Sequence, residues 1–199
     1  MNDKRLFAPS TARNRGPILD VLRNVLPPKG VALEIASGAG EHVTFFAEHM
    51  SGLTFCPSDP NAEAQESISA WIAFTRLANV KAPLALNVEE FPWPINAADA
   101  IICINMTHIS PWSATEALFE GGVRTLSAGA PLYLYGPYKR GGAHTAPSNA
   151  EFDASLRARN AAWGIRDLED VAACARAKGF GEPQVVDMPA HNLSVIFRR

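Results

Sequence analysis

The chain has 199 residues, enough to bury one sizeable core, and we expect a single domain spanning residues 1–199. Its 18 basic and 20 acidic residues give a formal net charge of -2, which disfavours nucleic acid or a membrane surface as a partner and favours a small molecule. Three dispersed cysteines without metal-ligand spacing, and no apolar run of signal or membrane length, predict a metal-free cytoplasmic protein.

The predicted elements alternate between amphipathic helices and short β-rich runs. In chain order we expect a helix at 15–26, a strand at 31–37, a helix at 41–50, a strand at 53–59, a helix at 61–78, strands at 82–88 and 98–105, a helix at 113–126, a strand at 130–137, helices at 149–163 and 168–179, and strands at 182–188 and 193–199. Pro17 suits the first turn of the first helix.

The order of these elements indicates the fold class. Repeated strand–helix units predict an α/β three-layer sandwich around a mostly parallel, seven-stranded sheet. The last two strands are separated by only residues 189–192, which is short enough for a C-terminal antiparallel β-hairpin. This is the arrangement of the Rossmann-like class I methyltransferase fold, whose members use S-adenosylmethionine. The sequence does not indicate an oligomeric state.

The stretch LEIASGAGEHV, residues 33–43, joins the first strand to the following helix through Gly38-Ala39-Gly40. A dinucleotide-binding fingerprint would need a third glycine where Val43 stands. Glu41 opposes the ~0.3–1 kcal/mol by which a helix N-terminus stabilises a bound anion. The turn therefore favours S-adenosylmethionine, which carries an ammonium and a sulfonium but no phosphate. Glu41 itself is equally consistent with a ligand and with a solvated residue.

Three polar residues complete the predicted cofactor site. Glu34 lies in an apolar strand, where an ionised carboxylate needs a donor or a cation. Asp59 ends the second strand about 20 residues after the glycines, where an acid accepts hydrogen bonds from ribose hydroxyls in NAD enzymes as well. Asp59 is also suited to cap the next helix. Asn87 follows the third strand, where we expect the adenine.

Several longer segments support this interpretation. They are RNRGPIL, LEIASGAGEH, NMTHISPW, YGPYKRGG, SNAEFDASLR, WGIRDLEDV and HNLSVIFRR. In these segments, from about Arg13 to Arg199, the chain closely resembles a family of class I methyltransferase-like proteins of unknown function whose animal member is called methyltransferase-like protein 26. The resemblance implies the fold and S-adenosylmethionine as the cofactor, and it supplies no substrate.

The carboxyl ends of parallel strands are where ligands bind in open α/β sheets, so we sought catalytic residues there. Asn105 and His108 follow the fourth strand. His108 is the first candidate for a general base near neutral pH, and its alternative role is to cap the loop before Pro111. Asn105 is suited to orient a substrate or to contact the cofactor loop.

Candidate substrate-binding residues come from three segments at the same edge. They are Tyr138, Lys139 and Arg140 of a predicted mobile basic loop, His191 and Asn192 of the hairpin turn, and Asn14 and Arg15 of a predicted lid before the first strand. Lys139 and Arg140 are equally consistent with a solvated surface pair.

Other conspicuous side chains are predicted to be structural. Phe45, Phe46, Trp71 and Phe74 lie at helical spacing and are expected in the core. Arg157, Arg159 and Arg166 are expected to pair with Asp153, Asp167 or Glu169.

Three functions remain in competition after the sequence is read. The preferred one is a methyltransferase that transfers the methyl group in line to a small molecule without a metal. The second is a non-catalytic protein that binds S-adenosylmethionine or S-adenosylhomocysteine, or serves as a scaffold, on the same fold. The third is an NAD-dependent reductase, which the incomplete glycine fingerprint and the flanking glutamates disfavour.

Overall fold

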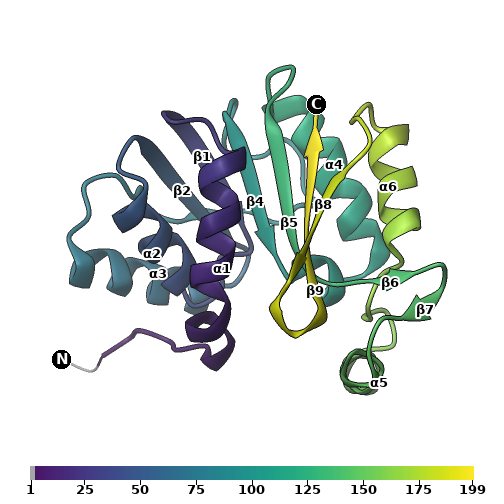
Figure 1. The fold of residues 1–199 in the computed structure, drawn as a ribbon. Coiled ribbons are helices and arrows are strands. Elements are labelled where there is room, and N and C mark those ends of the chain that lie inside the picture. The colour runs from purple at the N-terminus through teal and green to yellow at the C-terminus, as the bar shows by residue number, and fades with distance from the viewer. Residues whose placement is uncertain (1–2) are drawn as a thin grey trace.

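The structure is a computed structural model that describes residues 3–199 (Figure 1). Its helices are α1 (Pro9–Val25), α2 (Glu41–His49), α3 (Ala62–Thr75), α4 (Trp112–Thr125), α5 (Pro147–Arg159) and α6 (Leu168–Ala177), with 3-10 turns η1 (Met106–His108) and η2 (Pro189–His191). Its strands are β1 (Gly30–Ile35), β2 (Leu53–Asp59), β3 (Leu84–Ala85), β4 (Ala100–Ile104), β5 (Pro131–Pro137), β6 (Lys139–Arg140), β7 (Ala143–His144), β8 (Gln184–Met188) and β9 (Asn192–Arg198).

Seven strands form one sheet in the order β3-β2-β1-β4-β5-β9-β8. β1 to β5 are mutually parallel, whereas β9 runs antiparallel to both β5 and β8. The predicted parallel sheet and C-terminal hairpin are thus confirmed. The strand order reverses between β1 and β4, which creates the switch point at which open α/β sheets bind ligands.

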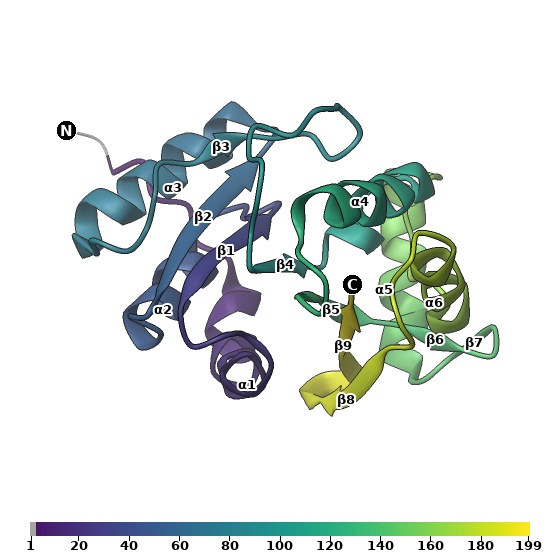
Figure 2. The same cartoon turned by 90° about the horizontal axis from the view of Figure 1, so that it is seen from above.

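Helices cover both faces of the sheet and produce the predicted three layers (Figure 2). α1 and α2 bury their apolar side chains, including Phe46 of α2, on one face of the sheet. There they pack with Phe55 of β2 and Tyr133 of β5. α4 and α6 cover the other face, where Phe119 and Phe197 pack edge to face with ring centroids 5.1 Å apart. Within residues 3–199, no helix has the length and apolar character needed to cross a membrane.

The first helix begins earlier than predicted. α1 starts at Pro9, so Pro17 lies in its interior and not in its first turn. Ile18 and Leu22 are buried, as the apolar stripe predicts. Residues 14 and 15 are part of this helix, so the prediction that they form a separate lid before the first strand is wrong.

A segment outside the main sheet, residues 138–167, links β5 to α6. The stretch predicted to be a mobile loop forms instead the small hairpin of β6 and β7. The N–H of Gly142 donates to Asp167 Oδ2 over 2.6 Å, and the N–H of Gly141 donates to Glu169 Oε2 over 3.1 Å. The hairpin is therefore tied to the start of α6.

Asp153 fixes α5 to the rest of this segment. Its carboxylate accepts the Ile165 N–H at 2.7 Å and the Arg157 Nε–H at 3.2 Å, so the predicted pairing of Arg157 is confirmed. Arg166 behaves differently from the prediction, because its guanidinium donates to the backbone carbonyls of Thr107 and Ser110. These bonds join the segment to the loop that follows β4.

Candidate functional site

A tight turn connects β1 to α2 at the carboxyl edge of the sheet. Its backbone is left-handed at Ala36 and Gly38, with φ of 54° and 55°. The Gly38 N–H donates to Asp59 Oδ2 over 2.9 Å, which ties the turn to the end of β2. A Cβ added at Gly38 would meet no atom within 4 Å, so the backbone here faces open space.

The two glycines of the turn have different roles. Gly40, with φ of 90°, lies directly against α3, and a Cβ added there would come within 2.9 Å of Ile68 Cα. Gly40 therefore permits close packing of the turn on α3. Only Gly38 presents its backbone to the open space that a ligand could fill. Between them, the Ala39 carbonyl accepts a hydrogen bond from Ser67 Oγ at 2.7 Å.

Asp59 lies at the end of β2 and is 7% exposed. Besides Gly38, its carboxylate accepts the Asn61 N–H at 2.9 Å through Oδ1. Asn61, and not Asp59, caps α3 by accepting from the Glu63 N–H at 2.8 Å. Each carboxylate oxygen of Asp59 accepts one bond from the chain and retains a second lone pair for a ligand.

Glu34 lies in β1 beneath the turn and is 2% exposed. Burial, reinforced by the charge of Asp59 and opposed by a hydrogen bond from Ser37, raises the pKa of Glu34 to about 8. Its Oε2 atom is buried without a hydrogen-bond partner among the described residues. Glu34 is thus protonated near neutral pH, which agrees with the expected cost of an ionised carboxylate in an apolar strand.

Asn87 follows β3 and uses its side chain within its own turn. The amide Nδ2 donates to Glu90 Oε1 over 2.9 Å, while Oδ1 accepts the Glu89 N–H at 3.2 Å. One donor hydrogen and one acceptor lone pair remain for other partners.

A cleft of about 740 Å³ opens beside the ends of β4 and β5. Its polar lining consists of Ser10, Arg13, Asn14, Asn105, Tyr135, Ser148, Asn149 and Asn192. Three of these, Asn14, Asn105 and Asn192, are residues that the sequence proposed for ligand binding. They come from α1, the end of β4 and the β8–β9 turn, which converge at the lower edge of Figure 1.

Hydrogen bonds to neighbouring groups fix the side-chain orientation of two of these asparagines. Asn14 Oδ1 lies 2.8 Å from His42 Nε2. The pKa of His42 is lowered to about 4 by burial and by the charge of Arg15, so its ring is neutral and donates to Asn14. Asn192 Nδ2 donates to the Pro189 carbonyl over 3.0 Å. Both amides therefore present a defined orientation to the cleft.

His108 does not reach this cleft. Its side chain is completely buried, packs edge to face on Tyr138 with ring centroids 4.9 Å apart, and lies directly under Gly136. Burial, together with the charge of Arg166, lowers the pKa of His108 to about 3. The imidazole is enclosed and does not line the cleft, which disfavours the predicted role of His108 as a general base.

The predicted basic loop is also separated from the cleft. Tyr138 is completely buried, and burial raises its pKa. Lys139 Nζ lies 3.6 Å from Asp153 Oδ2, on the side of the segment that faces α6. Arg140 makes an exposed contact with Asp187 at 3.3 Å, so of Lys139 and Arg140 only Arg140 fits the alternative of a solvated surface residue. None of the three lines the cleft.

Two further predicted substrate residues lie away from the cleft. Arg15 projects from α1 onto Phe45, with its guanidinium 4.6 Å from the ring centroid, in a groove beside α2 and α3. His191 has an exposed side chain, and only its backbone carbonyl faces α5, where it accepts from Asn149 Nδ2 over 3.2 Å.

The sequence did not reveal several residues around the site. Among them, Ser67 contacts the amino-terminal residues as well as the turn, whereas Asn149 and Phe152 line the cleft from α5. The serine and the asparagine look like ordinary helix residues because their partners are distant in the chain. Within residues 3–199, no group of three or more His, Cys, Asp or Glu side chains is placed to hold a metal ion.

Solved structures share this architecture. An O-methyltransferase family protein from Burkholderia thailandensis has a TM-score of 0.79 and 15% identity over 96% of this chain and 57% of its own. Human N-acetylserotonin methyltransferase, in complex with S-adenosylmethionine, has a TM-score of 0.80 and 14% identity over 96% of this chain and 52% of its own. The mitomycin 7-O-methyltransferase MmcR has a TM-score of 0.81 and 14% identity over 96% of this chain and 54% of its own.

At these identities the likeness establishes the fold, which is the Rossmann-like fold of S-adenosylmethionine-dependent methyltransferases. The chain spans little more than half the length of each of these three proteins. Residues 5–199 match a family described as protein of unknown function (DUF938), and the chain belongs to that family.

Proposed function

We propose that this chain binds S-adenosylmethionine at the glycine turn and transfers its methyl group to a small molecule held in the neighbouring cleft, leaving S-adenosylhomocysteine. The observation that carries the proposal is the geometry of Gly38. Its backbone is left-handed, is tied to Asp59 and faces open space at the sheet's switch point. An exposed backbone at this place allows the close approach that a nucleoside cofactor requires.

The residues around the turn fit this cofactor. The free lone pairs of Asp59 can accept the ribose hydroxyls, and the free donor of Asn87 can reach an adenine nitrogen. The buried, unpartnered oxygen of Glu34 is suited to bind the ammonium group of the cofactor. The positive charge of that group would also favour release of the proton from the Glu34 carboxyl group. Asn105 lines the cleft and follows β4, the strand paired with β1, so it would contact both ligands.

Bound S-adenosylmethionine supplies an electrophilic methyl carbon. The contribution of the chain is then to hold the acceptor in line at ~3–3.5 Å, which by itself accelerates a displacement strongly. Asn14, Asn192 and the Tyr135 hydroxyl provide hydrogen bonds from different elements for that purpose. Phe152 and Ile109 provide apolar contact on the remaining walls. We assign His108 to the support of this site and not to proton transfer.

The second candidate function is cofactor binding without turnover. The burial of His108 favours it, because the side chain first suited to act as a general base is enclosed under β5. Incubation with radiolabelled S-adenosylmethionine and small-molecule extract distinguishes the two functions. Methyl transfer predicts a labelled small product, and pure binding predicts none.

Isothermal titration calorimetry tests the cofactor proposal itself. We expect S-adenosylmethionine and S-adenosylhomocysteine to bind with one-to-one stoichiometry and NAD to give no heat of binding. Binding of NAD, together with no heat from either methionine derivative, would support the reductase instead. No heat of binding from any of the three ligands would reject the proposed function.

A further inference from the structure

The amino-terminal residues 3–8 form an arm that crosses the middle and the C-terminal half of α3 at the carboxyl edge of the sheet (Figure 1). The Leu6 N–H donates to Ser67 Oγ over 2.8 Å, and the Leu6 carbonyl accepts from Trp71 Nε1 at 3.1 Å. One residue of the arm therefore uses both of its backbone groups on α3. This docking gives the arm a fixed path on the helix.

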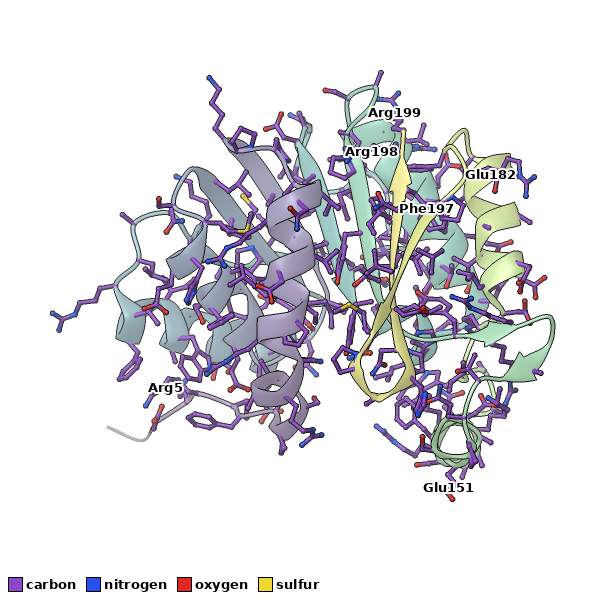
Figure 3. The ribbon with its side chains drawn as sticks, in the orientation of Figure 1. Arg5, Glu151, Glu182, Phe197, Arg198 and Arg199 are labelled. Carbon is purple, nitrogen blue, oxygen red and sulfur yellow. The ribbon has the colours of Figure 1, made fainter. Side chains whose placement is uncertain are left out.

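Aromatic and cationic side chains hold the arm from the outside. The Arg5 guanidinium lies 3.8 Å from the ring centroid of Phe74 and 4.9 Å from that of Trp71 (Figure 3). Phe7 packs edge to face on Trp71 with centroids 5.3 Å apart. Phe7 and Phe74 are 62% and 63% exposed, so the expectation that Phe74 lies in the core is wrong. The contacts are largely open to water and individually weak, which makes the arm separable from the folded body.

Two side chains, those of Ser67 and Glu41, connect the docked arm to the glycine turn. Ser67 is fully buried, and its hydroxyl accepts from Leu6 while donating to the Ala39 carbonyl over 2.7 Å. Glu41 Oε2 accepts the Ala8 N–H at 2.6 Å. Ala39 and Glu41 flank Gly40, so the arm is bonded to the turn on both sides of its packing glycine.

We propose that the arm is a strap whose docking is coupled to ligand binding at the glycine turn, with Ser67 and Glu41 as the positioning residues that transmit the coupling. This inference rests on the proposed binding of S-adenosylmethionine at Gly38. Because binding equilibria are reciprocal, a docked arm that orders the turn raises cofactor affinity, and a bound cofactor stabilises the docked arm by the same factor.

Trypsin provides a direct readout, because Arg5 precedes Leu6 in the arm. With the 199-residue chain, we expect S-adenosylhomocysteine to slow cleavage after Arg5, with a midpoint at the calorimetric Kd. Cleavage after Lys29, at the opposite end of β1, should keep its rate. An unchanged rate after Arg5 at saturating ligand would contradict the coupling.

Two serines of the same helix provide a matched pair of variants. Ser67→Ala removes the shared hydroxyl, and we expect about 3–10-fold weaker S-adenosylhomocysteine binding and loss of the ligand-dependent protection after Arg5. Ser69→Ala removes an exposed hydroxyl that bonds only to the Gln65 carbonyl, and it should behave like the parent. A Glu41→Ala variant should reproduce the effect of Ser67→Ala from the other side of the turn.

The outcomes separate this inference from the proposed function. A parent protein that fails to bind S-adenosylhomocysteine refutes the proposed function and the strap together. A parent that binds, with Ser67→Ala and Glu41→Ala binding equally well, refutes the strap alone. Thermal melting of each variant in the absence of ligand identifies any variant that fails to fold. If either Ser67→Ala or Glu41→Ala fails to fold, the affinity of the remaining variant is compared with that of the parent.

Discussion

The two halves of the carboxyl edge are built differently. Around β1 and β2, the glycine turn and Asp59 are held by hydrogen bonds between residues about 20 positions apart, such as the 2.9 Å bond from Gly38 to Asp59. Around β4 and β5, the segment of residues 138–167 folds back over the strand ends and encloses His108 and Tyr138. In the first half the backbone at Gly38 faces open space, whereas the second half buries the side chains with the most obvious chemistry.

This difference indicates which groups are expected to contact a ligand in each half of the edge. At the turn, the relevant groups are main-chain atoms and one acid, and position in the fold identifies them. Beside β4 and β5, they are amides brought together from α1, α5 and the hairpin turn, such as Asn14, Asn149 and Asn192. The chemical reactivity of an isolated side chain does not identify the ligand contacts there, because packing decides whether that side chain is exposed. His108 is an example, since it is completely buried.

The largest effect is expected from Gly38→Val. The new side chain would occupy the open space beside the turn, and we predict at least ~100-fold weaker S-adenosylhomocysteine binding by calorimetry. The left-handed φ of 55° adds about 1–3 kcal/mol of destabilisation, which chemical denaturation would measure. Parental affinity in this variant would mean that the ligand site lies elsewhere on the edge.

The next effect is expected from His108→Ala, and it should appear in stability and not in binding. Removal of a fully buried ring under β5 should cost about 3 kcal/mol of unfolding free energy. Affinity for S-adenosylhomocysteine should stay within twofold of the parent. The opposite pattern, with stability retained and methyl transfer lost, would restore His108 as a catalytic residue and erase the contrast between the two halves.

A pH-dependent effect concerns Glu34. The pKa of Glu34 is raised from 4.5 to about 8 by folding, so the folded state retains a proton that the unfolded state releases. Its contribution to stability is full below about pH 4.5 and is lost as the pH rises through about 8. Glu34→Gln stays neutral, so we expect its free energy of unfolding near pH 9 to exceed that of the parent by up to about 5 kcal/mol.

Denaturation of both proteins from pH 5 to pH 9 would measure this difference. Curves that remain parallel across the range would show that Glu34 does not titrate in this window, which would contradict a pKa of about 8.

The fold could be predicted from the sequence because its signals are local and repeated. Apolar runs separated by turn residues define the strands, and the bounds predicted for β2 agree with the structure. The start of α1 was misplaced because both Pro9 and Pro17 suit a first helical turn, and only tertiary packing decides between them. The small hairpin of β6 and β7 was missed because two-residue strands leave no periodic pattern.

The candidate site was predictable only in part, for a physical reason. The glycine turn and Asp59 lie at fixed positions in a repeated strand–helix unit, so their proximity follows from the fold. The burial of Tyr138 depends on how residues 138–167 pack, which no local pattern specifies. Ser67 links the arm to the turn through partners 61 and 28 positions away, and a serine in a helix gives no sign of that.

We propose that the backbone at Gly38 faces a nucleoside cofactor that Asp59 holds by its ribose. A crystal structure of the protein grown with S-adenosylhomocysteine would test this binding mode. We expect density for the ligand against the Gly38 backbone, with the ribose hydroxyls within hydrogen-bond distance of Asp59. A ligand bound elsewhere, or a turn left without ligand density although the crystals contain saturating S-adenosylhomocysteine, would contradict the proposal.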